Sequence, residues 1–401
     1  MTRPIPREPT IGERIRHRRT LLGYPIREAA VRAGIPHTTW SRIERGHLPA
    51  DNRFTLTAIA EALSCPVSAL AAPPPPTDRA EADTSGAAYE TLQAVLYADL
   101  AHEPTGRRPP IEATLRELEA VCGMRLRCDY AAAVRRLPAL ARDLHAATFG
   151  PDRAEALRGL VLAEDAAAFT LRYLNNEPIW SYLVAERAQQ AAAELDDPVM
   201  LGLAAFTRSH AAIACGLWAH ALTIAGHTAD ALRPHLARPE APEVYGQLLL
   251  TQAYCRYAVG RTDEAADLVA EAQRIADRTG DTTTLGLMFG PTNIKIWRIA
   301  MEADGDSPGR AVEIARTTNP SAVGSISRQA AYYLDTARAL ARVGKDHEAL
   351  RLLLTAERIA PQRIRHPLVI ETTRGLLERA RRGAGWTELR GLSRRLGVDD
   401  A

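Results

Sequence analysis

Small residues recur at fixed spacings in the C-terminal half of the chain, and this spacing restricts how the chain can fold. Intervals of seven, five, seven and five residues join Ala337, Gly344, Ala349, Ala356 and Pro361. The same register is followed by Ala253, Gly260, Ala265 and Ala272, and in part by Ser209, Gly216 and Ala221. Two antiparallel helices approach closely only where side chains are small, and glycine permits the tight turn between them. Each copy therefore predicts one helical hairpin.

This register resembles that of tetratricopeptide repeats, with copies about 40–45 residues apart. The resemblance implies an α-solenoid of stacked hairpins with a concave groove. Composition agrees, because 46% of the 401 residues are hydrophobic but only 5% are aromatic, so alanine and leucine must fill the core. Alanine favours helices over strands. From Ala87 onward no period-two alternation appears, so we predict an all-α fold.

A run of four prolines, Pro73–Pro76, divides the chain. We predict an N-terminal tail at 1–8, a DNA-binding domain at 9–72, a Pro-rich linker at 73–87 and a repeat domain at 88–401 for sensing or dimerisation. Residues 1–72 hold eleven arginines, no lysine and six acidic residues, a net charge of +5. The whole chain carries +2, so the remainder carries −3. This asymmetry indicates a nucleic acid at one end only.

The basic segment at 10–70 is predicted to form five short helices. Within it, Ile26–Gly46 contains a helix, a turn at Gly34 and a second helix. This stretch resembles the Cro/repressor class (XRE family) of helix-turn-helix domains. The resemblance implies a buried ion pair between Arg19 and Glu44 that joins the first helix to the recognition helix. We therefore expect both residues to be structural.

The recognition helix is expected at about Pro36–Arg45, with one face against base edges. By position in the motif, the predicted base readers are His37, Thr38 and Arg42. The predicted phosphate contacts, which position the domain, are Thr39, Arg45, Asn52 and Arg53. Two positions depart from the family. Ile26 replaces the usual Gln, and Pro36 replaces the usual Ser cap.

The repeat register also predicts which side chains line the concave groove. We expect a ligand groove formed by Phe206, His210, Gln247, Tyr254, Tyr257, Asn293, Trp297, Arg338 and Arg342. Amides can pair with both donors and acceptors, and arginines can bind a carboxylate through two hydrogen bonds. The stretch Phe289-Gly290-Pro291-Thr292-Asn293 resembles one in actinobacterial regulators that join a Cro-type head to such repeats. That resemblance implies a transcriptional regulator. The two-part layout also resembles that of the peptide-pheromone receptors of Gram-positive bacteria, which implies a homodimer joined through the body.

We therefore expect a regulator that binds an inverted repeat in double-stranded DNA and responds to a peptide or small-molecule effector. Two alternatives remain open: an interaction scaffold whose repeats hold a partner protein, and a ligand-independent regulator whose repeats only dimerise. We expect no enzymatic activity, because His347-Glu348 is followed by Arg351 where a zinc-binding H-E-x-x-H motif needs a second histidine. No metal or other cofactor is predicted. We expect no signal peptide or membrane span, and a cytoplasmic protein that is nucleoid-associated when bound to DNA.

Overall fold

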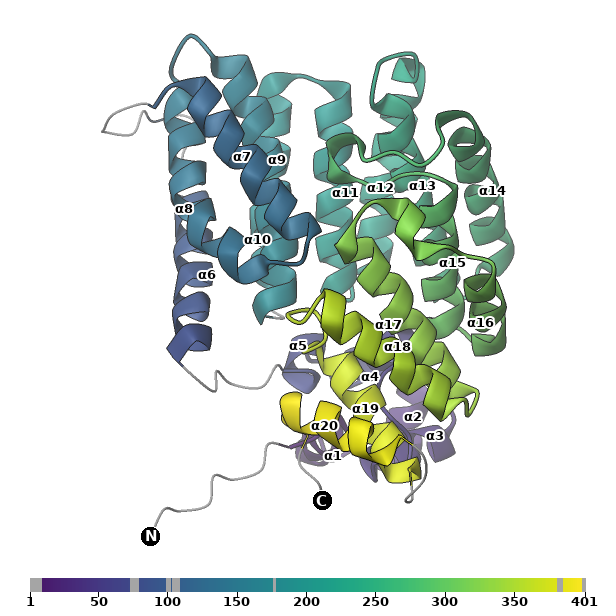
Figure 1. Cartoon of the computed structure of the whole chain (residues 1–401). Coiled ribbons are helices and arrows are strands. Elements are labelled where there is room, and N and C mark those ends of the chain that lie inside the picture. Colours follow the sequence, from purple (N-terminus) through teal and green to yellow (C-terminus); the bar gives the residue numbers. More distant parts are fainter. Residues whose placement is uncertain are drawn as a thin grey trace.

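The structure, a computed structural model, describes residues 9–72, 79–98, 102, 109–175, 178–380 and 385–398. Within these ranges the chain is helical and contains no strand. We call α1–α5 the head and α6–α20 the body (Figure 1). The head helices are α1 (Ile11–Leu21), α2 (Ile26–Arg32), α3 (His37–Glu44), α4 (Arg53–Ala62) and α5 (Val67–Leu70).

The body begins with α6 (Arg79–Tyr97), α7 (Ile111–Leu126), α8 (Tyr130–Ala147), α9 (Arg153–Asn175) and α10 (Pro178–Leu195). It continues with α11 (Pro198–Ala214), α12 (Trp218–Leu232), α13 (Ala241–Ala258), α14 (Thr262–Thr279) and α15 (Pro291–Asp304). The last helices are α16 (Pro308–Arg316), α17 (Ile326–Arg342), α18 (Asp346–Ile359), α19 (Pro367–Arg379) and α20 (Trp386–Arg395). Short 3₁₀ turns lie at Arg233–His235, Thr284–Gly286 and Pro320–Val323.

The five head helices begin where the sequence supplies a cap or a proline. Thr10 and Glu13 form a capping box at α1, since each side chain accepts a hydrogen bond from the backbone N–H of the other. Asn52 caps α4 by accepting from the Thr55 amide at 2.8 Å. The fully buried Trp40 lies in the core that these helices enclose.

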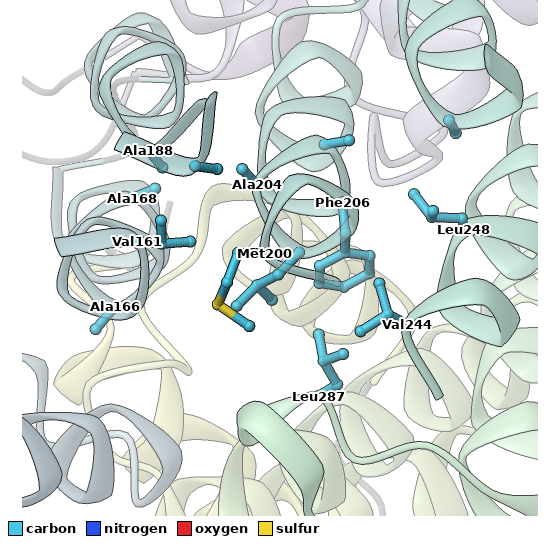
Figure 2. Packing of buried hydrophobic residues seen from close by; sticks show 14 of the residues in the cluster. Val161, Ala166, Ala168, Ala188, Met200, Ala204, Phe206, Val244, Leu248 and Leu287 are labelled. Atoms are coloured by element: carbon cyan, nitrogen blue, oxygen red, sulfur yellow. The ribbon is translucent and has the colours of Figure 1, made fainter. Parts of the chain in front are cut away.

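Several pairs of consecutive body helices pack side by side, among them α11–α12, α13–α14 and α17–α18, and short turns join the two helices of these three pairs (Figure 1). Gly216, Gly260 and Gly344 lie at the α11–α12, α13–α14 and α17–α18 turns, each with φ between 76° and 83°. Non-glycine residues rarely adopt this region. The small residues of the register are buried, among them Ala253 and Ala337. Figure 2 shows the larger side chains that fill the core between them, including Met200, Phe206, Val244, Leu248 and Leu287.

The predicted linker at 73–87 is too long, because α6 begins at Arg79. Alanine and glutamate are strong helix formers, and they occupy Ala80, Glu81 and Ala82. An Arg79–Asp83 ion pair one turn apart adds support, as does the Glu81 contact with Arg365 ahead of α19. Of the predicted linker and tail, residues 73–78 and 1–8 lie outside the described residues.

Head and body share a packed boundary. Leu368 of α19 joins the hydrophobic core of the head. Gly375 lies so close to the head that an added Cβ would be 2.3 Å from Pro49 Cγ. A Cβ on Gly216 would be 3.0 Å from the Thr57 methyl group of α4. The head is therefore held against the body by side-chain packing.

The Phe289–Asn293 stretch fixes the start of α15. Gly290 has φ 147°, and an added Cβ would be 2.3 Å from Asp281 Oδ1, so only glycine fits. Asp281 in turn accepts from the Thr292 amide at 3.0 Å and from its hydroxyl at 2.7 Å. Phe289 is buried against Gly246 of α13. These contacts place Asn293 inside the body.

We predict that Gly246→Ala destabilises the protein, because the added methyl group would lie 2.2 Å from Phe289 Cζ. Overpacking of this kind costs about 1–3 kcal/mol. Gly309→Ala in α16 is the matched control, since nothing lies within 4 Å of its added Cβ. Thermal unfolding should show a lower Tm for Gly246→Ala and an unchanged or higher Tm for Gly309→Ala. Equal melting temperatures would contradict the packing described for Phe289.

Candidate nucleic-acid interface and its junction with the body

The recognition helix α3 spans His37–Glu44, flanked by Pro36 and Arg45 as predicted. The three predicted base readers, His37, Thr38 and Arg42, are all exposed. Thr38 and Arg42 are four residues apart and so share one face of the helix. The opposite face is buried through Trp40, Ile43 and Glu44. This arrangement leaves one polar face of α3 free for a groove of DNA.

Glu44 fixes α3 relative to α1. Its carboxylate accepts from Arg19 Nε at 2.6 Å and from Arg19 Nη2 at 2.9 Å. The Trp40 indole N–H donates to the same carboxylate at 2.6 Å. Arg19 also donates to the Tyr24 carbonyl at 2.7 Å. This buried ion pair orients the recognition helix, and neither member faces outward.

The four predicted phosphate contacts separate into two groups. Arg45 is exposed and Thr39 is partly exposed, beside the base readers. Asn52 and Arg53 instead contact the body. Asn52 Nδ2 donates to the Asp304 carbonyl at 2.6 Å, and Arg53 pairs with Asp304 and Asp335. The phosphate assignment of Asn52 and Arg53 is corrected here, because the body occupies their donors: a backbone carbonyl accepts from Asn52, and two carboxylates accept from Arg53.

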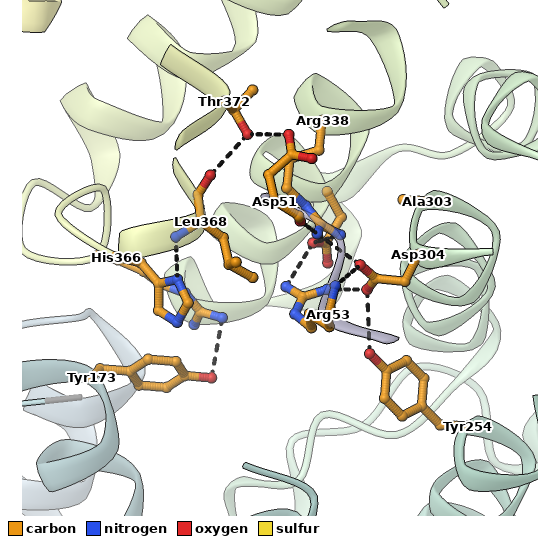
Figure 3. Close-up of polar contacts among 12 residues, drawn as sticks. Asp51, Arg53, Tyr173, Tyr254, Ala303, Asp304, Arg338, His366, Leu368 and Thr372 are labelled. Atoms are coloured by element: carbon orange, nitrogen blue, oxygen red, sulfur yellow. Dashed lines mark hydrogen bonds and ion pairs between the residues drawn. The ribbon is translucent and has the colours of Figure 1, made fainter. Parts of the chain in front are cut away.

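Asp304 is the centre of the contact between head and body (Figure 3). Its side chain is completely buried at the last position of α15. Arg53 donates to it from the backbone amide at 3.0 Å and from Nη1 at 2.5 Å. Arg338 Nη1 donates at 2.8 Å, and the Tyr254 hydroxyl at 3.3 Å. The carboxylate also lies at the N-terminus of α4, where the helix dipole favours negative charge.

Three further residues complete this junction cluster, which we define as Asp51, Arg53, Asp304, Asp335, Arg338 and Thr372. Arg338 Nη1 also donates to the Asp51 carbonyl at 2.6 Å, and the Thr372 hydroxyl donates to the Asp51 carboxylate at 2.8 Å. Burial opposes ionisation of Asp304, but Arg338 and Arg53 hold the pKa of its carboxyl below the usual range. Burial raises the pKa of Asp51.

The head fills part of the predicted ligand groove. Phe54 of α4 contacts the rings of Trp218, Tyr254 and Tyr257, at centroid distances of 5.6, 5.4 and 6.3 Å. Arg342 donates to the Ala303 carbonyl. Four predicted groove residues, Tyr254, Tyr257, Arg338 and Arg342, therefore lie at the boundary with the head. The expectation of one continuous open groove is corrected by this arrangement.

The other five predicted groove residues line a separate small pocket inside the body. They are Phe206, His210, Gln247, Asn293 and Trp297. These residues lie on α11, α13 and α15, and the centroid of the His210 ring is 4.4 Å from that of Phe206 and 5.3 Å from that of Trp297. The pocket and the boundary with the head meet where the Trp297 and Tyr254 rings lie 5.7 Å apart.

A cleft of about 1120 Å³ separates the C-terminal part of α3 from the body. Thr39, Arg42 and His47 line it from the head, and Arg342 and Arg379 line it from the body. His37 and Thr38 lie outside this lining. The body therefore approaches the recognition helix on one side without covering its exposed face.

Five residues of this site are not evident from the sequence, namely Asp51, Phe54, Asp304, Asp335 and Thr372. One signal was available for Asp304. A carboxylate at the C-terminal end of a helix is unfavourable toward the helix dipole, so its presence points to a cation or a helix N-terminus elsewhere. Position along the chain could not reveal that the partner is 251 residues away.

In the part of the chain that the structure describes, no group of three or more His, Cys, Asp or Glu is arranged to hold a metal ion. Among the described helices, none has the length and apolar character needed to cross a membrane.

We predict that Asp304→Asn weakens the packing of the head against the body. Among the described residues, Asp335 would then be the one acidic partner left to both Arg53 and Arg338. Breaking such a buried pair costs about 3 kcal/mol. Amides of α4 should then exchange with deuterium roughly 100-fold faster. Exposed Asp306, two residues on, supplies the control Asp306→Asn, which should leave α4 unchanged. Unchanged protection of α4 in Asp304→Asn would contradict the central position given to Asp304.

Comparison with known proteins agrees with the geometry of the head. The family described as helix-turn-helix domain matches residues 10–72, which contain α1–α5. Searches of the curated proteins and of the solved structures found no match to the chain. The chain thus carries an N-terminal helix-turn-helix DNA-binding domain followed by a helical body.

Proposed function

We propose that the protein is a sequence-specific transcriptional regulator of the Cro/repressor (XRE) class. The observation that carries this proposal is the helix-turn-helix domain at 10–72 with an exposed polar face on α3. The net charge of +5 on residues 1–72 supports attraction to phosphates. The buried Arg19–Glu44 pair supports a recognition helix held in one orientation.

We further propose that the protein acts as a homodimer on an inverted repeat, because paired half-sites suit a single recognition helix per chain. The exposed apolar side chains Tyr89, Ile179 and Leu183 on α6 and α10 support dimerisation through the body. Ile179 and Leu183 are four residues apart on α10 and so share one face of that helix, and exposed apolar faces often form contacts between chains. We propose that the hairpins stack as a tetratricopeptide-like solenoid, which the glycine turns at Gly216, Gly260 and Gly344 support.

We propose that an effector bound by the body modulates DNA binding. The contact between head and body supports this, since the junction cluster joins α4, which directly follows the recognition helix and its loop, to α15 and α17. A change in α15 or α17 would act on Asp304 or Arg338, and hence on the position of the head. In the cell we place the protein in the cytoplasm, on the nucleoid when bound to DNA.

The proposal is tested by selecting binding sites from random DNA with the full chain, then measuring affinity by fluorescence anisotropy at two salt concentrations. We expect one enriched inverted repeat that binds at least 1000-fold more tightly than random DNA, within the usual range of about 10³–10⁷. Equal affinity for enriched and random DNA would refute the proposal. Light scattering should give the protein mass of two chains for the free protein or for the protein bound to DNA. A mass of one chain in both states would refute the dimer.

We predict that Arg42→Ala weakens binding to the selected site by about 1–3 kcal/mol and relaxes the preference at one base pair, because Arg42 is exposed on α3 to contact guanine. Arg45→Ala is the matched control. Arg45 is exposed just after α3, so its loss should weaken all sequences alike and reduce the salt slope by about 1. The assignment fails if both variants lose affinity uniformly.

A further inference from the structure

The body encloses a pocket of about 60 Å³ that the head does not reach. Its walls come from α7, α9, α11, α13, α15 and α17. The polar and aromatic lining includes Arg125, His210, Gln247, Asn293, Trp297 and Arg328. A water-sized group needs about 10–15 Å³, so this volume holds about four to six non-hydrogen atoms. The pocket is therefore suited to a small molecule.

Polar atoms at this pocket lack hydrogen-bond partners. Asn293 Nδ2 and Gln247 Oε1 are unpaired, and both side chains are only 1% exposed. The other end of each amide is occupied: Asn293 Oδ1 accepts from Arg328 Nε at 2.7 Å, and Gln247 Nε2 donates to the Leu287 carbonyl at 2.6 Å. These bonds leave one donor and one acceptor without a partner. Buried polar groups in native proteins nearly always have a partner, so this pair points to a bound molecule.

The pocket also carries an uncompensated positive charge. The lining also holds one carboxylate, that of Asp165, which pairs with Arg125 at 3.2 Å. Within the described residues Arg328 makes no ion pair; it donates to Asn293 and lies over the Trp297 ring at 5.8 Å. Nearby Arg363 donates to Ser327 and Tyr173 rather than to a carboxylate. Burial lowers the pKa of Arg328 to about 10, so it is still a cation at neutral pH. A partly buried cation without a counter-ion is costly unless an anion binds beside it.

We propose that this pocket binds a small organic carboxylate that also carries a hydroxyl group. The carboxylate oxygens accept from Arg328 and from Asn293 Nδ2, and the hydroxyl donates to Gln247 Oε1. This proposal rests on the proposed function in that it names the chemical class of the effector. A carboxylate matches the guanidinium better than a neutral group, because charge-assisted hydrogen bonds are about twice as strong as neutral ones.

The pocket and the junction cluster lie on the same two helices. On α15, Asn293 is near the first turn and Asp304 is the last residue. On α17, Arg328 is in the first turn, and Arg338 lies nearly three turns further along. An acid that moves Arg328 and Asn293 together would thus change the relation of α15 to α17. The same two helices position Asp304 and Arg338 against the head.

The test titrates the full chain with glycolate by calorimetry, with acetate and neutral acetamide as comparison probes. We expect glycolate to bind most tightly, acetate about tenfold more weakly and acetamide not at all. Arg328→Gln should weaken glycolate binding at least tenfold without lowering the Tm, because it removes an unpaired charge. Exposed Arg316 on α16 supplies the control Arg316→Gln, which should bind like the wild type.

Asn293→Asp is a second variant with a distinct expectation. Its new carboxylate should pair with Arg328, raise the Tm and abolish glycolate binding. The proposal is overturned if glycolate does not bind, if acetamide binds equally well, if Arg328→Gln binds like the wild type, or if Arg328→Gln lowers the Tm. DNA binding is measured in a separate experiment without any acid. Failure of glycolate to bind would therefore leave the proposed regulator intact, and failure to bind DNA would leave the pocket proposal intact.

Discussion

One buried carboxylate, that of Asp304, determines how the two parts of the protein are joined. It accepts hydrogen bonds from the backbone and side chain of Arg53 in the head and from Arg338 and Tyr254 in the body. A carboxylate in the protein interior is stable only when paired in this way. The start of α4 and the end of α15 must therefore come together for Arg53 and Asp304 to bury their charges.

The orientation of the DNA-reading surface follows from this contact. Arg53 begins α4, and α4 packs with α2 inside the head. Glu44 and Arg19 then join α3 to α1, so α3 has a fixed relation to the body. The exposed face of α3 points away from this packing. A single conformation of the body thus presents the recognition helix in a single direction.

Sequence reasoning reached the parts of the fold that depend on neighbours along the chain. The five head helices and the glycine turns at Gly216, Gly260 and Gly344 follow from local preferences and spacing. The Arg19–Glu44 pair came from a motif resemblance and has its expected geometry. The helix that starts at Arg79 is harder to predict, because the four prolines before it indicate a break in helical structure more strongly than the alanine-rich residues after it indicate a helix.

The candidate site was less predictable, because its parts meet across large sequence distances. An arginine that pairs with a phosphate and one that pairs with Asp304 look the same in sequence, so the motif alone predicts a phosphate contact for Arg53. The repeat register predicts groove residues for a body without a head packed against it. In the structure, Phe54 of the head covers the predicted groove at Tyr254 and Tyr257. The part of the groove around Asn293 remains as a small pocket inside the body. Packing of distant elements, rather than local pattern, decides which polar groups are free.

The most direct test of this account is a double-mutant cycle between Arg53 and Asp304. The free energy of unfolding would be measured for Arg53→Ala, Asp304→Ala, the double variant and the wild type. Contacting charged groups show coupling, whereas distant sites add. We predict a coupling energy of at least about 1.5 kcal/mol, within the range of about 0.5–3 kcal/mol for contacting residues. Additive effects within about 0.5 kcal/mol would contradict the claim that Asp304 holds the head to the body.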